Sequence, residues 1–172
     1  MRTCLKIIAV IAVLVSVVAC GKQPKSVSVE KDGSKYEIAD QISFYYPKDF
    51  QMNTTLENKE IIQFVRNQEV ISYRTIVDDT DNDINDLPEL YAGQLEEDGA
   101  DNVGYKNVEI TSGLVCQEFT GNYISTGIQF KHMVYFTVHS TYVLSYEAPT
   151  QEYEKNIGEM THYLNSLVVH GE

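Results

Sequence analysis

Tryptophan is absent from the 172-residue sequence, cysteine occurs three times, and 13 Lys and Arg face 25 Asp and Glu. The shortage of positive charge argues against nucleic acid as a partner, because that binding relies on Lys and Arg contacts to phosphates. The sequence also lacks a G-x-S-x-G elbow, an H-E-x-x-H pair and a phosphate-binding glycine loop, and it contains no internal repeats. It therefore offers no ready catalytic motif, and we expect no cofactor.

The one long hydrophobic run lies at the start of the chain. Residues 7–19 (IIAVIAVLVSVVA) carry no charge, follow Arg2 and Lys6, and end on the small residue Ala19. This layout is typical of a secretory signal peptide. The run is short for a transmembrane helix, which needs about 20 apolar residues, and the charged segment GKQPK follows at once. An uncleaved membrane anchor is the alternative.

Residues 17–20 (VVAC) resemble the lipobox of bacterial lipoproteins. In that family the cysteine thiol receives a diacylglyceryl group, the signal peptidase cuts before the cysteine, and the new N-terminus is often acylated too. The resemblance implies that residues 1–19 are removed and that Cys20 is the lipid attachment site. Each buried methylene contributes about 0.8 kcal/mol, so two or more acyl chains, such as palmitate, anchor a protein stably. We expect a membrane-anchored protein on the outer side of the cytoplasmic membrane, or in the outer membrane if the host has one.

The mature chain is expected to be acidic and free of disulfides. Removing residues 1–19 leaves 153 residues, one ordinary domain, with 11 Lys and Arg against 25 Asp and Glu, a formal charge of −14. Anionic headgroups repel such a surface. Cys4 leaves with the leader and Cys20 carries lipid, so Cys116 has no partner. We interpret Cys116 as a buried small hydrophobe in a strand rather than a nucleophile, because no basic group stands beside it.

Residues 20–35 have the composition of a tether, with four lysines that would lie near lipid headgroups, and we place a single domain at residues 36–172. A short hairpin around Asp32-Gly33, with Val27 and Val29 on one side and residues 36–38 on the other, is the alternative.

The first half of the domain carries strand signals and one helix signal. Residues 42–47 end on Pro47, which cannot donate to a ladder, and the pattern resumes at 49–52. Residues 60–65 and 69–77 predict a hairpin. The segment 86–99 predicts an amphipathic helix of about three turns. Its signals are the capping box Asp86 and Glu89, Pro88 in the first turn, Gly99 as the stop, and an apolar face of Leu87, Leu90, Tyr91 and Leu95.

The second half predicts four strands and a helix. The strands span residues 105–110, 114–123, 128–139 and 142–147. The helix spans residues 151–165, with Tyr153, Ile157, Met160 and Leu164 at helical spacing, and a short apolar tail, 167–169, follows. In the third strand we assign one face to the core: Phe130, Val134, Phe136 and Val138.

The order of these parts resembles the PsbP-like fold, named for an extrinsic subunit of photosystem II and found in many bacterial lipoproteins of unassigned function. The likeness spans residues 36–169, and Phe50 departs from it, because such domains often have Trp after the proline. The resemblance implies an α+β fold, mainly an antiparallel sheet with helices packed on both faces, and no common catalytic residues. It rests on Tyr46-Pro47 with Asp49-Phe50, the helix from Leu87, the Gly113-x-x-Cys116 step, the strand 142–146 with Ala148, and the last helix ending at 165–167.

The acidic run 78–86 (DDTDNDIND) is the best candidate for a metal site. An EF-hand loop that starts at Asp79 has Asp81 and Asp83 at its third and fifth positions. The same loop then meets Ile84 where glycine is needed and a leucine where the bidentate Glu belongs, and no other register works. We interpret the run as a solvated, turn-forming loop. A weak Ca²⁺ site at these three aspartates is the alternative.

The histidines and tyrosines form no recognisable metal or catalytic site in the sequence. His132 and His139 differ in parity on one predicted strand, so they should point to opposite faces and not bind one metal. His162 and His170, on the last helix and tail, are interpreted as surface or partly buried residues. In the pair Tyr45-Tyr46 one ring should face the core and the other solvent or a ligand.

These patterns favour a non-catalytic lipoprotein of the cell envelope, anchored in the membrane by its N-terminal lipid, that binds a small ligand or an envelope protein or supports a complex. One alternative is an enzyme with a scattered site, such as the acidic loop with His132 or His139. Another is a solute-binding accessory of a transporter.

Overall fold

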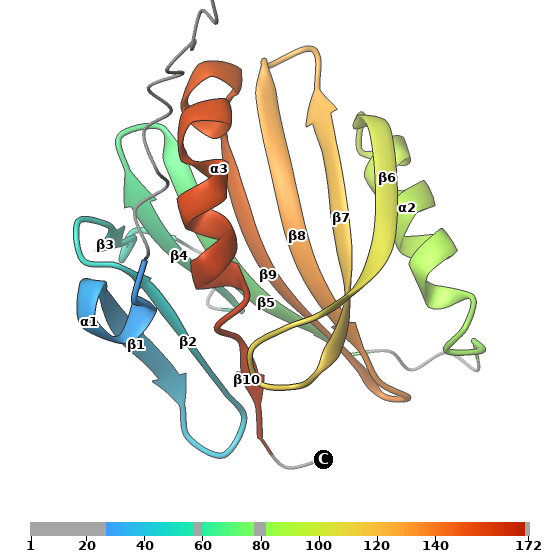
Figure 1. Cartoon of the computed structure of the whole chain (residues 1–172). Coiled ribbons are helices and arrows are strands. Elements are labelled where there is room, and N and C mark those ends of the chain that lie inside the picture. Colours follow the sequence, from blue (N-terminus) through green and yellow to red (C-terminus); the bar gives the residue numbers. More distant parts are fainter. Residues whose placement is uncertain (1–26, 57–59, 78–81, 171–172) are drawn as a thin grey trace, which may run out of the picture.

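The computed structural model describes residues 27–56, 60–77 and 82–170 (Figure 1). A seven-stranded antiparallel sheet has the order β3-β4-β5-β9-β8-β7-β6, and a small sheet has the order β1-β2-β10. The small-sheet strands are β1 (Gly33–Ile38), β2 (Ile42–Pro47) and β10 (Val168–Val169). The large-sheet strands are β3 (Gln51–Met52), β4 (Ile61–Arg66), β5 (Glu69–Val77), β6 (Asp101–Glu109), β7 (Val115–Tyr123), β8 (Ile128–Phe136) and β9 (Ser140–Pro149). The helices are α1 (Val29–Asp32), α2 (Leu87–Glu97) and α3 (Thr150–Leu164).

Local sequence signals explain the strand pairings of the large sheet. The predicted hairpin is β4–β5, and Asn67 at its turn has a positive φ of 54°, a conformation that Asn tolerates better than most residues. The predicted four-strand meander is β6–β9. Its last strand returns to pair with β5 over eight residue pairs, from Val70 with Glu147 to Val77 with Ser140. This long-range pairing joins the hairpin and the meander into one sheet.

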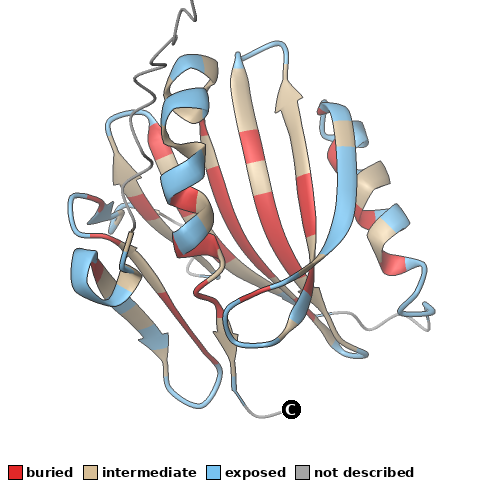
Figure 2. Ribbon diagram, in the orientation of Figure 1, coloured by how far each residue is buried: buried red, intermediate tan, exposed pale blue. Residues whose placement is uncertain are grey.

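Helices cover different parts of the two sheet faces. On one face, α3 and the small sheet pack over β4, β5 and β9, and this core includes Phe44, Phe64, Tyr146 and Leu164. On the other face α2 packs over the β6–β8 side, around Phe119 and its neighbours. Figure 2 shows the buried residues concentrated along β5, β9 and β8, whereas β6 is exposed along most of its length. Each face of the sheet therefore has a part that no described helix covers.

The second predicted helix is confirmed, but two details of the first differ from expectation. Asp86 makes no side-chain cap hydrogen bond, because its own backbone is already helical (φ −89°, ψ −19°), whereas a capping residue needs an extended backbone. Leu90 is 52% exposed, although Leu87, Tyr91 and Leu95 are buried as expected. Gly99 ends the helix with φ +93°. None of the helices in the described part of the chain is long and apolar enough to cross a membrane.

The folded unit begins earlier than residue 36, so residues 27–35 are not a free tether. Val27 and Val29 pack against the larger core. Gly33 opens β1 so close to the backbone that an added Cβ would lie 2.6 Å from the Val29 carbonyl oxygen and 2.8 Å from the Tyr163 ring. The alternative hairpin is also displaced, since α1 spans Val29–Asp32 and the hairpin is β1–β2.

The third meander strand ends before Val138, which corrects the predicted core face. Phe130 and Val134 are fully buried and Phe136 is partly buried, but Val138 is 70% exposed. The Thr137 hydroxyl and backbone N–H both donate to the Ser140 carbonyl oxygen, at 2.9 Å each, and this turn replaces the strand ladder there. The strand β6 starts at Asp101, four residues before its predicted start.

Candidate functional site

A polar site lies at β6 and β7, on the same face of the large sheet as α3. No described helix covers this part of that face. Strand alternation and register place Lys106 opposite Glu118, and Thr120 opposite both Gly104 and Lys131. These five side-chain positions therefore share one face of three neighbouring strands. We call this set of residues, Gly104, Lys106, Glu118, Thr120 and Lys131, the polar hollow.

Glu118 is buried between two lysines. Its Oε1 lies 3.1 Å from Lys106 Nζ and its Oε2 lies 3.0 Å from Lys131 Nζ. Lys131 also donates to Thr161 Oγ1 of α3 at 3.2 Å. The side chains of Glu118 and Lys131 are 9% and 12% exposed, whereas that of Lys106 is 68% exposed. Burial acts to raise the pKa of Glu118, but hydrogen bonds from Lys131 and Lys106 outweigh it, so the pKa is lowered and the carboxylate is ionised.

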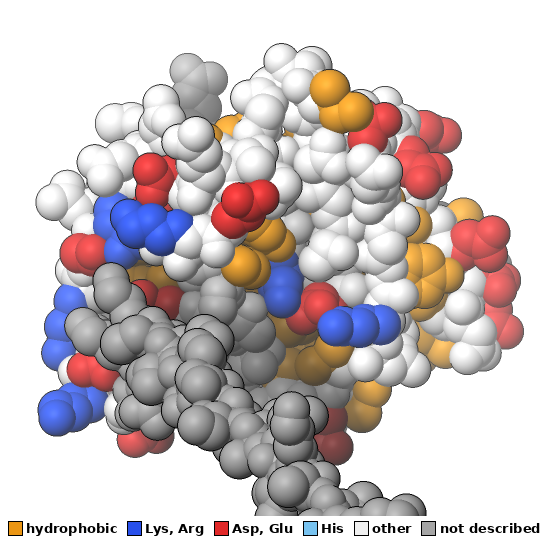
Figure 3. Space-filling model, turned by 45° about the horizontal axis from the view of Figure 1, so that its top comes forward, with side chains coloured by type: hydrophobic (Ala, Val, Ile, Leu, Met, Phe, Trp, Pro, Cys, Tyr) orange, Lys and Arg blue, Asp and Glu red, His pale blue; other side chains and the backbone are white. Residues whose placement is uncertain are grey.

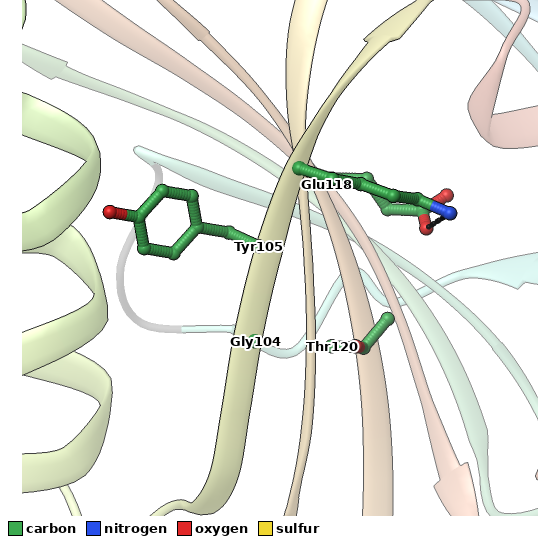
Figure 4. A pocket seen from close by; sticks show the side chains of 5 residues that line it. Gly104, Tyr105, Glu118 and Thr120 are labelled. Atoms are coloured by element: carbon green, nitrogen blue, oxygen red, sulfur yellow. Dashed lines mark ion pairs between the residues drawn. The ribbon is translucent and has the colours of Figure 1, made fainter.

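A cavity of about 150 Å³ is lined by Gly104, Tyr105, Lys106, Glu118 and Thr120. Figure 4 shows the Tyr105 ring pointing to the opposite side of β6 from Glu118, so the ring does not enter the cavity. Gly104 leaves open space, because an added Cβ there would meet no atom within 4 Å. In Figure 3 basic and acidic side chains lie next to one another near the middle of the surface, beside hydrophobic ones.

A second polar group lies on the opposite face, under α2. His132 is 4% exposed, and its Nδ1 is 2.9 Å from the Tyr91 hydroxyl, which also accepts from Arg74 Nη2 at 3.5 Å. His132 Nε2 makes no hydrogen bond and lies 3.5 Å from a Glu147 carboxylate oxygen. The ring of Phe130 is tilted by 37° against His132, with 4.7 Å between the ring centroids, and shields the histidine further. This histidine therefore belongs to the α2 packing layer.

The other histidines and the adjacent tyrosines have ordinary positions. His139 is exposed in the turn after β8, so the parity argument does not apply to it, and His162 is exposed on α3. His170 is exposed, with Nε2 3.3 Å from Ser43 Oγ. Tyr45 and Tyr46 are both partly buried, and Tyr46 stacks on Phe64. None of these groups marks a site.

Of the expected site residues, Cys20, Asp79 and Asp81 lie outside the described residues. Asp83 is exposed, and its Oδ1 accepts hydrogen bonds from the Asn85 backbone N–H and side-chain amide at 2.9 and 2.7 Å. The described part of the chain contains no group of three or more His, Cys, Asp or Glu residues that could hold a metal ion.

Cys116 is 1% exposed, and burial raises the pKa of its thiol to about 11. The thiol is therefore protonated at neutral pH and a poor nucleophile. This agrees with its interpretation as a small buried hydrophobe.

Solved structures share the architecture of this chain. The solution structure of cyanobacterial PsbP from Synechocystis superposes with a TM-score of 0.57 at 10% identity, covering 88% of this chain and 99% of that chain. This chain has a PsbP-like fold. The α+β class with a mainly antiparallel sheet, expected from the sequence, is thereby confirmed.

Two further structures share the PsbP-like fold. The Ran-binding protein Mog1p of Saccharomyces cerevisiae has a TM-score of 0.52 at 12% identity, with 80% of this chain and 95% of that chain covered. A crystal structure from Bacteroides thetaiotaomicron has a TM-score of 0.54 at 16% identity, with 82% and 50% covered. No protein-family model and no curated protein matches the sequence. These identities establish the fold and carry over no residue's role.

Proposed function

We propose that this chain is a non-catalytic binding module of the cell envelope, anchored by lipid at Cys20, and that the polar hollow is its binding surface. The observation that carries the proposal is the buried Glu118, held between two lysines beside an open cavity. The yeast Ran-binding protein supports the idea that a PsbP-like fold can serve binding.

The charges of the hollow support recognition better than stability. A buried ion pair adds little net stability, because desolvation offsets most of its Coulomb energy. An ammonium group has three N–H donors. Lys106 Nζ forms an ion pair with Glu118, and the Lys106 side chain is 68% exposed. Donors of Lys106 therefore remain for a ligand at the open rim.

The ionisation states support binding rather than chemistry. General acid–base catalysis works best with a group whose pKa lies near the ambient pH. The pKa of the Glu118 carboxyl is lowered and that of the Cys116 thiol is raised, so each is held in one form at neutral pH. His132 is shielded by Tyr91 and Phe130.

The anchor is tested by Cys20→Ala in cells fed labelled palmitate. We expect the wild-type chain to incorporate label and to sediment with membranes, and the variant to do neither. A labelled variant would overturn the lipid-attachment assignment.

The binding surface is tested by photocrosslinking in native membranes. A photoreactive phenylalanine analogue in place of Thr120 should give a discrete crosslinked product, because this side chain lines the cavity. The same analogue in place of Glu154, which is exposed on α3, is the matched control. Crosslinks of equal yield from both positions, or from neither, would contradict a binding role for the hollow.

A further inference from the structure

We propose that the outer edge of β6 is a docking edge for an extended peptide segment, which adds to the sheet as a further strand and places an acidic side chain in the polar hollow. This inference rests on the proposed function and specifies its ligand. The occupant is a short segment of another envelope protein with an Asp or Glu flanked by apolar residues.

The two edge strands of the large sheet differ in length. At one edge β3 is two residues long, and a short edge strand is a poor template for pairing. At the other edge β6 spans nine residues, all exposed except Val103 and Val108, which are partly buried. No strand in the described part of the chain pairs with its outer side. A long free edge with unpaired N–H and C=O groups is the surface that strand addition uses.

The regular part of β6 sets the length of the added strand. The pairing of β6 with β7 is irregular between Asp101 and Gly104 and then continuous to Glu109. A bulge twists an edge away from indiscriminate pairing. The segment 104–109 therefore offers a template of about six residues, which suits a short peptide.

Alternation along β6 sets the pattern of the peptide. The side of Gly104 and Lys106 faces the hollow, whereas the Tyr105 ring points to the α2 side, with its centroid 5.2 Å from that of Phe119. Tyr105 is 47% exposed, so it presents apolar surface beside the edge. A strand added next to β6 would alternate in the same way, with one side chain over the hollow and its neighbours beside Tyr105.

Space and charge select the side chain that enters the hollow. Gly104 leaves open space, and the cavity of about 150 Å³ extends from it to Glu118. Two lysines surround the single carboxylate there, and Lys106 is largely exposed. The hollow therefore carries one excess positive charge on a chain that is acidic as a whole. A carboxylate on a flexible segment can reach this charge, whereas a large acidic surface would be repelled by the rest of the protein.

The test uses the lipidated full chain in nanodiscs and a phage library of random decapeptides, with empty nanodiscs for counter-selection. We expect selected peptides to share one acidic residue between apolar residues. A labelled synthetic copy of the consensus peptide should bind in fluorescence anisotropy and slow amide hydrogen exchange in residues 104–109. Exchange of a central glutamate for glutamine in that peptide should weaken binding about tenfold.

Two variants test the hollow and the edge separately from folding. Lys106→Glu reverses the exposed charge, and Gly104→Leu fills space that is open in the free protein. Each should weaken peptide binding at least about tenfold. Lys155→Glu is the matched control, because Lys155 is 74% exposed on α3, and it should leave binding unchanged. Circular dichroism and urea midpoints establish that each variant is folded.

Selected peptides without an acidic preference, or protection from exchange outside β6, would overturn the docking edge. If the library yields no binder while crosslinks from residue 120 still form, the docking edge is wrong and the binding role of the hollow stands. If neither a peptide binder nor a crosslink from residue 120 is found, both the docking edge and the binding role of the hollow are wrong.

Discussion

Glu69 and Glu118 lie on the same side of the same sheet and are buried to a similar extent, 4% and 7% exposed, yet their partners differ. Glu69 accepts hydrogen bonds from Arg66 Nε and Nη2 at 2.8 and 2.9 Å, from the Tyr146 hydroxyl at 2.7 Å and from the Asn156 amide at 2.8 Å. These donors come from β4, β9 and α3, and they surround the carboxylate. Glu118 is held by two lysines at the margin of an open cavity, and one of them, Lys106, is largely exposed.

The rest of the Glu69 network is equally constrained. Arg66 also donates to Asp49 at 2.8 Å, and its guanidinium lies 4.5 Å from the centroid of the Phe50 ring. Burial acts to raise the pKa of Glu69, but the hydrogen bonds from Arg66, Tyr146 and Asn156 outweigh it, so the pKa is lowered. Burial and ionisation alone therefore do not distinguish a structural carboxylate from a binding one. The two differ in the exposure of their partners, since the Lys106 side chain is 68% exposed and that of Arg66 is 20% exposed.

The largest expected effect on stability comes from removing the Glu69 carboxylate from its hydrogen-bond network. Glu69→Ala leaves Arg66 without its main partner and leaves the Tyr146 hydroxyl buried without its acceptor. We expect the free energy of unfolding to fall by about 3 kcal/mol, measured by urea denaturation of the mature chain without its lipid. Glu152→Ala is the control, because its ion pair with Lys155 is exposed, and it should change stability by less than about 0.5 kcal/mol. A loss for Glu69→Ala no larger than this would contradict the structural role.

Acid should weaken the same network in the wild-type protein. A carboxyl whose pKa is lowered on folding contributes stability that is present above its unfolded pKa, about 4.3 for Glu, and lost as the pH falls through the folded value. We therefore expect the stability difference between wild type and Glu69→Ala to shrink as the pH falls from about 6 to about 3. Urea midpoints measured across this range check it. A difference that stays constant or grows in acid would refute the lowered pKa.

The free energy of unfolding should depend less on Glu118 of the polar hollow than on Glu69. Glu118→Gln removes the charge but keeps the size of the side chain, and Lys106 can return to water because it is already 68% exposed. Lys131 keeps its hydrogen bond to Thr161. We expect a loss of about 1 kcal/mol, smaller than for Glu69→Ala in the same assay. If the two losses were equal, both networks would be structural and the distinction between them would fail.

The elements that sequence patterns predicted well are those with local signals. The hairpin β4–β5, the meander and both long helices follow from alternation, helical spacing and turn residues, all of which act within about ten residues. Val138 was misassigned because Thr137 ends the strand through a side-chain hydrogen bond that alternation does not encode. The folded unit begins before residue 36 because Gly33 packs closely against Tyr46 and Tyr163, which are distant in the sequence.

The polar hollow was not predictable from the sequence in the same way. Glu118 and Lys131 are thirteen positions apart, and they meet only because of the register of β7 with β8. A signal was present, since each is a charged residue inside a predicted strand and next to a phenylalanine, Phe119 or Phe130. Alternation alone does not say which charges meet. Cys20 is the opposite case, because its proposed role as the lipid attachment site rests on the resemblance of the consecutive residues 17–20 to a lipobox and needs no knowledge of the fold.

Lys106→Met should have the smallest effect on stability and the largest effect on binding. Lys106→Met keeps the unbranched apolar stem and removes the ammonium group. Because the Lys106 side chain is mostly exposed, this removal should change the free energy of unfolding by less than about 0.5 kcal/mol. The same change leaves Glu118 with Lys131 as its one remaining cation, so the hollow loses its excess positive charge and its exposed donors. Crosslinking from residue 120 should therefore fall severalfold while urea midpoints stay near those of wild type. Lys155→Met, an equally exposed change on α3, should alter neither measurement. If Lys106→Met were to destabilise the fold as strongly as Glu118→Gln while leaving crosslinking intact, then Lys106 would be a structural partner like Arg66, and the contrast between the two glutamates would reverse.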